Sequence, residues 1–153
     1  MKRVLFSLSL VATVASCHPS ALVLYNTRGN QRVYPHFIDQ PMVLAFWRPD
    51  SIECIDDMAA LNALTRREGS VYVMGVCSSD DQVRANKWMR KEGVRYEVIS
   101  DPELRLAKRL GVSSYPTYVL FDRRGRQVDR RTDVRTIHNW FDRDRWRERL
   151  EAP

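Results

Sequence analysis

The sequence contains few of the residues from which metal and nucleotide sites are built. Among its 153 residues, His18, His36 and His138 are scattered and do not lie at metal-ligand spacing from Cys54 or Cys77. The sequence also has no phosphate-binding glycine loop and no nucleophile elbow. These absences argue against the common zinc, nucleotide and serine-hydrolase sites, and we expect neither a metal nor a cofactor.

The apolar run at residues 4–15 is too short to form a stable membrane span. It follows Lys2 and Arg3, and this arrangement is typical of a secretory signal, which we place at residues 1–16. The run ends in Val14-Ala15-Ser16-Cys17, which resembles the cleavage box of bacterial lipoproteins. The alternative is a plain signal peptide that is cut near Ala15 and leaves Cys17 as a thiol.

The resemblance to a lipoprotein box implies that Cys17 receives diacylglycerol and that residues 17–20 form a lipidated anchor segment. Acyl chains on one cysteine can hold a protein to a bilayer without a spanning helix. The residue after Cys17 is His18 rather than the aspartate that often retains lipoproteins in the inner membrane. We therefore expect a protein of the cell envelope that faces the periplasm from the outer membrane.

The charge of the chain does not indicate a nucleic-acid partner. Removal of residues 1–16 takes away Lys2 and Arg3 and no acid, so the formal net charge falls from +6 to +4. Arginines gather between residues 123 and 135, but aspartates are interleaved with them, which favours a solvated surface. With 44% hydrophobic and 29% charged residues, we expect residues 21–153 to form one domain with a core of its own.

Strand and helix patterns alternate along this domain. The continuous apolar run at 42–47 predicts a strand that is covered on both faces. The order of elements predicts an α/β fold with a mixed central sheet, flanking helices and an N-terminal β-hairpin. The predicted strands are 21–25, 31–34, 42–47, 71–76, 94–99, 117–121 and 127–128. The first predicted helix is capped by Asp50 or Ser51 and ends at Gly69, and the later helices are predicted at 79–91, 101–110 and 134–150.

Four features in this order resemble the thioredoxin-like thiol-disulfide oxidoreductases of the TlpA/ResA type. They are the hairpin with Gly29 in its turn, the strand 42–47 that leads directly into a helix, Gly75-Val76 before the polar stretch 78–81, and residues 111–117 followed by Asp122 and Gly125. The resemblance covers residues 21–130 and implies a thioredoxin-like fold. It also implies that Pro116 follows a cis peptide bond and that the backbone of Tyr115 pairs with bound substrate.

The chain departs from this family at the redox motif, which usually reads Trp-Cys-x-Pro-Cys. Asp50, Ser51, Ile52, Glu53 and Cys54 occupy those five positions. In the family, the first cysteine is the exposed nucleophile and the second resolves the mixed disulfide. The resemblance therefore implies that Ser51 stands in the place of the attacking sulfur, whereas the resolving sulfur remains as Cys54.

The surroundings of Cys54 do not predict a strongly activated thiol. A position in the first helical turn favours the thiolate, because unpaired N–H groups and the helix dipole attract negative charge. Four nearby carboxylates, those of Asp50, Glu53, Asp56 and Asp57, oppose that charge. We therefore interpret Cys54 as a packed structural cysteine.

Three functions are consistent with these residues. The first is a redox-degenerate module that binds envelope proteins or peptides, including cysteine-containing ones, at the rim formed by Tyr115 and Pro116. The second is a thiol-disulfide oxidoreductase that uses Cys54 alone or together with Cys77. The third is a peroxidase, because Ser51 and Cys54 match the Thr/Ser-x-x-Cys pattern of peroxiredoxins.

Overall fold

The structure, a computed structural model, describes residues 21–34, 41–49, 51–65 and 71–137. The predicted signal peptide, the anchor segment with Cys17, and the part of the predicted last helix after residue 137 lie outside these ranges. None of the helices in the described ranges combines the length and the apolar character that a membrane crossing requires.

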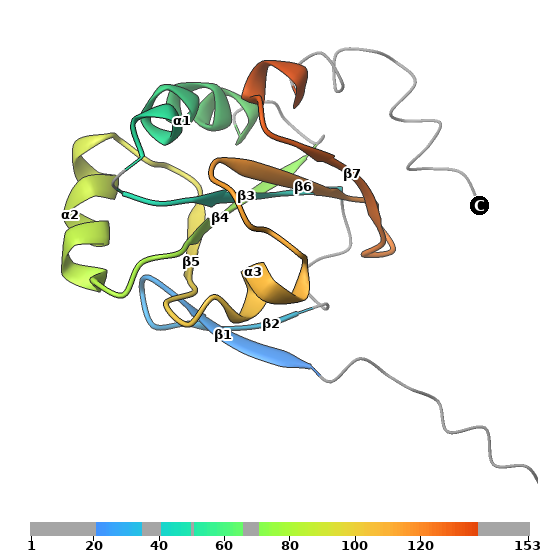
Figure 1. Cartoon of the computed structure of the whole chain (residues 1–153), viewed down its shortest axis with the longest axis horizontal. Helices are drawn as coiled ribbons and strands as arrows, with labels where there is room; N and C mark the ends of the chain where they lie inside the picture. The colour runs from blue at the N-terminus through green and yellow to red at the C-terminus, as the bar shows by residue number, and fades with distance from the viewer. Residues whose placement is uncertain (1–20, 35–40, 50, 66–70, 138–153) are drawn as a thin grey trace, which may run out of the picture.

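Seven strands form one mixed sheet in the order β2-β1-β5-β4-β3-β6-β7 (Figure 1). β3, β4 and β5 are parallel and occupy the centre, whereas antiparallel hairpins form both edges. The predicted thioredoxin-like arrangement, with its N-terminal hairpin, is therefore confirmed. The strand bounds are β1 Leu22–Asn26, β2 Gln31–Tyr34, β3 Met42–Trp47, β4 Tyr72–Cys77, β5 Glu97–Ser100, β6 Thr117–Phe121 and β7 Gln127–Arg131.

β3 lies at the centre of the fold because all six of its residues are buried. Successive side chains of a strand point to opposite faces, so the run contributes to two cores at once. Val43, Ala45 and Trp47 belong to one hydrophobic cluster, and the three residues between and before them belong to the other. The prediction of a strand covered on both faces is thus confirmed.

Helices cover the two faces unequally. α1 (Ile52–Thr65) and α2 (Gln82–Lys91) pack on the face that carries Val43 and Trp47. α3 (Arg105–Arg109) packs on the other face, through Leu106 and Ala107. Figure 1 shows α1 above the sheet and α3 below it.

The helices begin later than the sequence pattern predicts. The N-cap of α2 is Asp81, whose side chain accepts a hydrogen bond from the backbone N–H of Arg84 at 2.8 Å. α3 is shorter than the predicted 101–110 because Leu104 adopts a left-handed conformation, with φ at 57°. The Asp101 side chain is buried and accepts from the N–H groups of Leu106 and Ala107, so it stabilises the helix start from four residues upstream.

A crowded contact fixes Trp47 at the end of β3. Its ring stacks on that of Trp88 from α2, with centroids 4.6 Å apart. On the neighbouring strand, a Cβ atom at Gly75 would lie 2.9 Å from the Trp47 indole nitrogen and 2.9 Å from the Tyr96 ring. Glycine is therefore the residue at position 75 that leaves room for the indole ring.

Candidate functional site

The motif residues lie where two central parallel strands end and a helix begins. β3 ends at Trp47, and α1 starts at Ile52, so Ser51 and Cys54 lie just beyond this edge of the sheet. Cys77 ends the adjacent strand β4, directly opposite Trp47 in the sheet register. The topology therefore brings the sequence-predicted residues Ser51, Cys54 and Cys77 to the same end of the sheet.

Cys54 is fully buried, with an exposed fraction of 0%. Burial raises the pKa of its thiol, since a thiolate loses hydration there, and the carboxylates of Asp57 and Glu53 raise the pKa further. Hydrogen bonds with the Ser51 side chain and with the backbone of Arg48 favour the thiolate but do not reverse the shift. Cys54 is therefore a protonated thiol at neutral pH, as the sequence predicted.

The Ser51 hydroxyl contributes a polar group rather than a nucleophile to this site. Its Oγ donates to Glu53 Oε2 at 2.8 Å. In the described part of the chain, no backbone N–H donates to the Ser51 hydroxyl, so the predicted cap at Ser51 does not form. Asp50, the other predicted cap, lies outside the described residues. The pKa of Glu53 is lowered, first by a hydrogen bond with its own backbone and then by the one from Ser51. The neighbouring Ile52 side chain is 75% exposed, so an apolar group lies beside this carboxylate.

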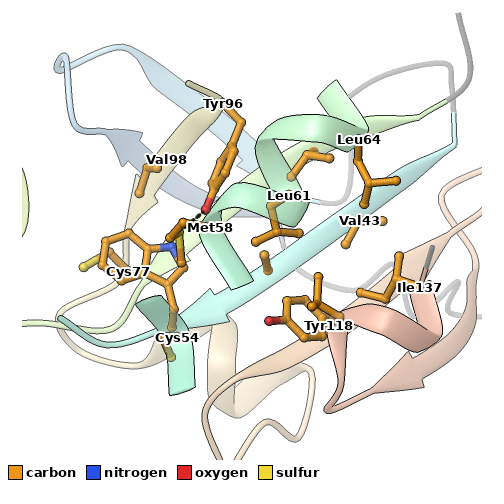
Figure 2. Close-up of a cluster of buried hydrophobic side chains, with 14 of the residues drawn as sticks. Val43, Cys54, Met58, Leu61, Leu64, Cys77, Tyr96, Val98, Tyr118 and Ile137 are labelled. Carbon is orange, nitrogen blue, oxygen red and sulfur yellow. Dashed lines mark hydrogen bonds between the residues drawn. The ribbon is translucent and has the colours of Figure 1, made fainter. Parts of the chain in front are cut away.

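A half-buried carboxylate, that of Asp57, lies one helical turn after Cys54. The Tyr118 hydroxyl, on β6, donates to the Asp57 carboxylate on α1. Burial raises the pKa of Asp57 despite this hydrogen bond, which by itself lowers it. Figure 2 shows Tyr118 and Tyr96 on either side of the α1 residues Met58 and Leu61, and the Tyr96 hydroxyl contacts the Met58 sulfur at 2.6 Å. The Cys54 thiol therefore belongs to the same packed cluster as Met58 and the rings of Tyr96 and Tyr118.

The proline loop adjoins the motif through Arg48. The Tyr115–Pro116 peptide bond is cis, as predicted. The Arg48 guanidinium carbon lies 5.9 Å from the centre of the Tyr115 ring, while the Arg48 carbonyl accepts from the Ser51 N–H at 3.2 Å. Arg48 therefore contacts both Ser51 and the proline loop.

Tyr115 has unpaired backbone groups at this rim. In the described part of the chain, its N–H and its C=O form no hydrogen bond. Its side chain is half-buried and packs against both hydrophobic clusters, so the residue is held in place. These backbone groups are available to an added peptide strand.

Cys77 is close to the motif in topology but is not bonded to Cys54. Both residues are buried thiols, and no disulfide joins them in the described ranges. Figure 2 shows their side chains at separate places within one hydrophobic cluster. Catalytic use of the pair therefore remains a prediction.

The sequence analysis did not identify Arg48 or Tyr118 as residues of this site. Tyr118 lies in an apolar strand and is therefore expected in the core. Only the fold shows that its hydroxyl reaches Asp57, 61 positions away in the sequence. Arg48 follows a strand in a polar loop, and no local pattern marks its contact with Tyr115. Among the described residues, no group of three or more His, Cys, Asp or Glu side chains could hold a metal ion.

Solved structures of similar fold include three bacterial proteins. DsbF of Mycobacterium tuberculosis is 18% identical with a TM-score of 0.71, over 79% of this chain and 92% of that one. A secreted disulfide oxidoreductase of the same organism is 17% identical with a TM-score of 0.66, over 73% and 83%. The exposed lipoprotein thioredoxin Etrx1 of Streptococcus pneumoniae is 20% identical with a TM-score of 0.64, over 80% and 98%.

Comparison with curated proteins finds no match. A family model described as the AhpC/TSA family matches residues 18–128, which include the motif, both buried thiols and the proline loop. The resemblance drawn from the sequence is thus confirmed for the fold and the family. The chain belongs to the AhpC/TSA family and has a thioredoxin-like fold.

Proposed function

We propose that this protein is a redox-degenerate thioredoxin-like module that binds extended polypeptide segments without dithiol exchange. The observation that carries the proposal is the state of the motif. Its outer position is Ser51, and its remaining sulfur, on Cys54, is fully buried with a raised pKa. A dithiol reaction needs two sulfurs, the first of them accessible as a thiolate.

The rim around the motif supports a binding role. The backbone N–H and C=O of Tyr115 are unpaired in the described part of the chain and can hydrogen-bond an extended segment. The exposed Ile52 side chain, at the start of α1, offers an apolar contact at the same edge of the sheet. Main-chain hydrogen bonds supply affinity in this mode of recognition, and side-chain contacts supply selectivity.

We place this activity in the cell envelope, with the chain held to a membrane through a lipid on Cys17. The residues Val14-Ala15-Ser16-Cys17 support this placement, and Etrx1, which has a similar fold, is itself an exposed lipoprotein. The intact mass of the mature N-terminus tests it, since an unacylated first residue would contradict a lipid anchor.

A second candidate is thiol-disulfide exchange by Cys54 alone. The AhpC/TSA family match favours it, and so does the Ser51 side chain, which by itself lowers the pKa of Cys54. In that reaction, the Cys54 thiolate attacks one sulfur of a substrate disulfide, and the other sulfur leaves as a thiolate. The peroxidase alternative needs the same thiolate with a cationic partner. The charged side chains that act on Cys54 are instead the carboxylates of Asp57 and Glu53, so we do not propose it.

Reduction of insulin tests the absence of dithiol chemistry. We expect negligible turnover by the wild-type chain, because position 51 supplies no sulfur. Ser51→Cys restores a Cys-x-x-Cys pair with Cys54, and we expect it to form a disulfide under oxidising conditions and to gain activity. Ser51→Ala, which removes the hydroxyl without adding sulfur, serves as the matched control and stays inactive. Robust turnover by the wild type would refute the proposal.

Binding of reduced, carboxymethylated insulin B chain tests the polypeptide-docking rim, since its blocked sulfurs exclude exchange. We expect saturable binding by fluorescence anisotropy. Ile52→Ser removes the apolar contact and weakens binding by about tenfold, the equivalent of burying one aliphatic side chain. Val128→Ser changes an exposed valine on β7 and leaves the affinity unchanged. Equal loss in both variants would place the docking surface elsewhere.

The ionisation of Cys54 distinguishes the two candidates. Because the pKa of this thiol is raised above its ordinary value of 9.0, the thiolate forms only at alkaline pH. The measurement is the pH titration of thiolate absorbance, as the difference between the wild-type chain and Cys54→Ser. Asp57→Asn removes a charge that raises this pKa, so we expect the midpoint to fall. Asp56→Asn, an exposed neighbour, leaves it in place. A midpoint below neutral pH would favour exchange by Cys54.

A further inference from the structure

A polar cavity of about 510 Å³ lies on a different part of the molecule from Cys54. The β1–β2 turn, the second half of α2 and the residues that lead into β5 line it, and Figure 1 shows these segments in blue, yellow-green and yellow. The cavity lies at the start of β5. Cys54, by contrast, lies near the residues where β3 and β4 end. Four arginines and one glutamate line the cavity, which gives its wall a net charge of +3: Arg28, Arg32, Arg90, Arg95 and Glu97.

The glutamate is fully engaged with one of these arginines and with two neutral side chains. Glu97 lies 2.8 Å from Arg32 Nε, accepts from Asn26 Nδ2 at 2.7 Å, and accepts from the Tyr72 hydroxyl. Burial by itself raises the pKa of Glu97, but these hydrogen bonds together lower it, so Glu97 is ionised. Arg32 and Glu97 thus neutralise one another.

The other three arginines have no counter-ion in the described part of the chain. Arg28, Arg90 and Arg95 take part in no ion pair and no side-chain hydrogen bond there. Arg90 has a structural role of its own, because a cation in the last turn of α2 complements the negative end of the helix dipole. Arg28 and Arg95 lie outside the helices and have no such role, so their positive charges are left to the cavity wall.

The backbone holds both of these arginines at the cavity. The Asn26 side chain accepts from the N–H of Arg28 at 3.0 Å and so fixes the β1–β2 turn. The Arg95 N–H donates to the buried Asn62 side chain of α1 at 2.8 Å. Since both backbones are fixed, both arginine side chains start from fixed points at the wall of the cavity. Such an arrangement favours a bound anion.

We propose that this cavity binds a phosphate group carried on a small polar molecule, either a soluble phosphoester or the headgroup of an anionic lipid. A phosphate suits it because several planar guanidinium forks can each donate to a different oxygen of one doubly charged group. The Asn86 side chain also lines the hollow and forms no hydrogen bond with a described residue, so it can bind hydroxyl groups of the carrier. The site is independent of the proposed polypeptide binding.

Calorimetric titration of the full chain with inorganic pyrophosphate tests the site. We expect saturable binding, weakened about tenfold in Arg28→Gln and in Arg95→Gln, since each substitution removes one charge-assisted contact. Arg124→Gln is the matched control: it removes the same charge from an exposed arginine in the β6–β7 turn, at the other edge of the sheet. Arg28 and Arg95 are exposed too, so all three variants keep the fold, which circular dichroism checks.

Two further probes identify the source of the phosphate. Saturable binding of glycerol 3-phosphate that depends on Arg28 and Arg95 supports a soluble ligand. Co-sedimentation with vesicles of phosphatidylcholine and phosphatidylglycerol that falls in these variants, but not in Arg124→Gln, supports a lipid headgroup. All variants have the same N- and C-terminal segments. Any binding to the vesicles through those segments is therefore the same in every variant. Absence of pyrophosphate binding, equal weakening in Arg124→Gln, or binding of citrate as tight as that of pyrophosphate would overturn the proposal.

Discussion

The burial of β3 on both faces is the constraint on which the rest of the structure depends. All six of its apolar residues pair with β4, five of them also pair with β6, and together they supply side chains to both cores. A strand held in this way fixes the position at which the chain leaves the sheet. The loop at Arg48 and the first turn of α1 therefore start from a rigid point, beside the proline loop that leads into β6.

The sequence predicted those elements whose signal is local and strong. The apolar run 42–47, the hairpin with Gly29 in its turn and the strand after Pro116 all formed near the predicted residues. The start of α3 was wrong, because Asp101 is buried and binds two backbone N–H groups of the next turn while Leu104 takes a left-handed conformation. A capping pattern in the sequence does not show whether the capping side chain is buried in the folded protein. Tertiary packing therefore overrides the local helix propensity at the start of α3.

The candidate site was predictable only as far as its alignment with the family motif. The positions of Ser51 and Cys54 followed from that alignment, and the neighbouring acids predicted that the Cys54 thiol is not strongly activated. The contact between Asp57 and Tyr118 joins residues far apart in the chain, and the arginines of the cavity come from three separate segments. The periodicity of a sequence predicts one helix or strand at a time. It therefore cannot predict contacts between residues of different elements.

The absence of a side chain at Gly75 limits which substitutions this position can accept. The rings of Trp47 and Tyr96 and the side chain of Val98 converge on the spot that any larger residue would need. Alanine at this point would therefore require the side chains of Trp47, Tyr96 and Val98 all to move away. In this chain, the glycine on β4 and the tryptophan at the end of β3 therefore constrain one another across the sheet.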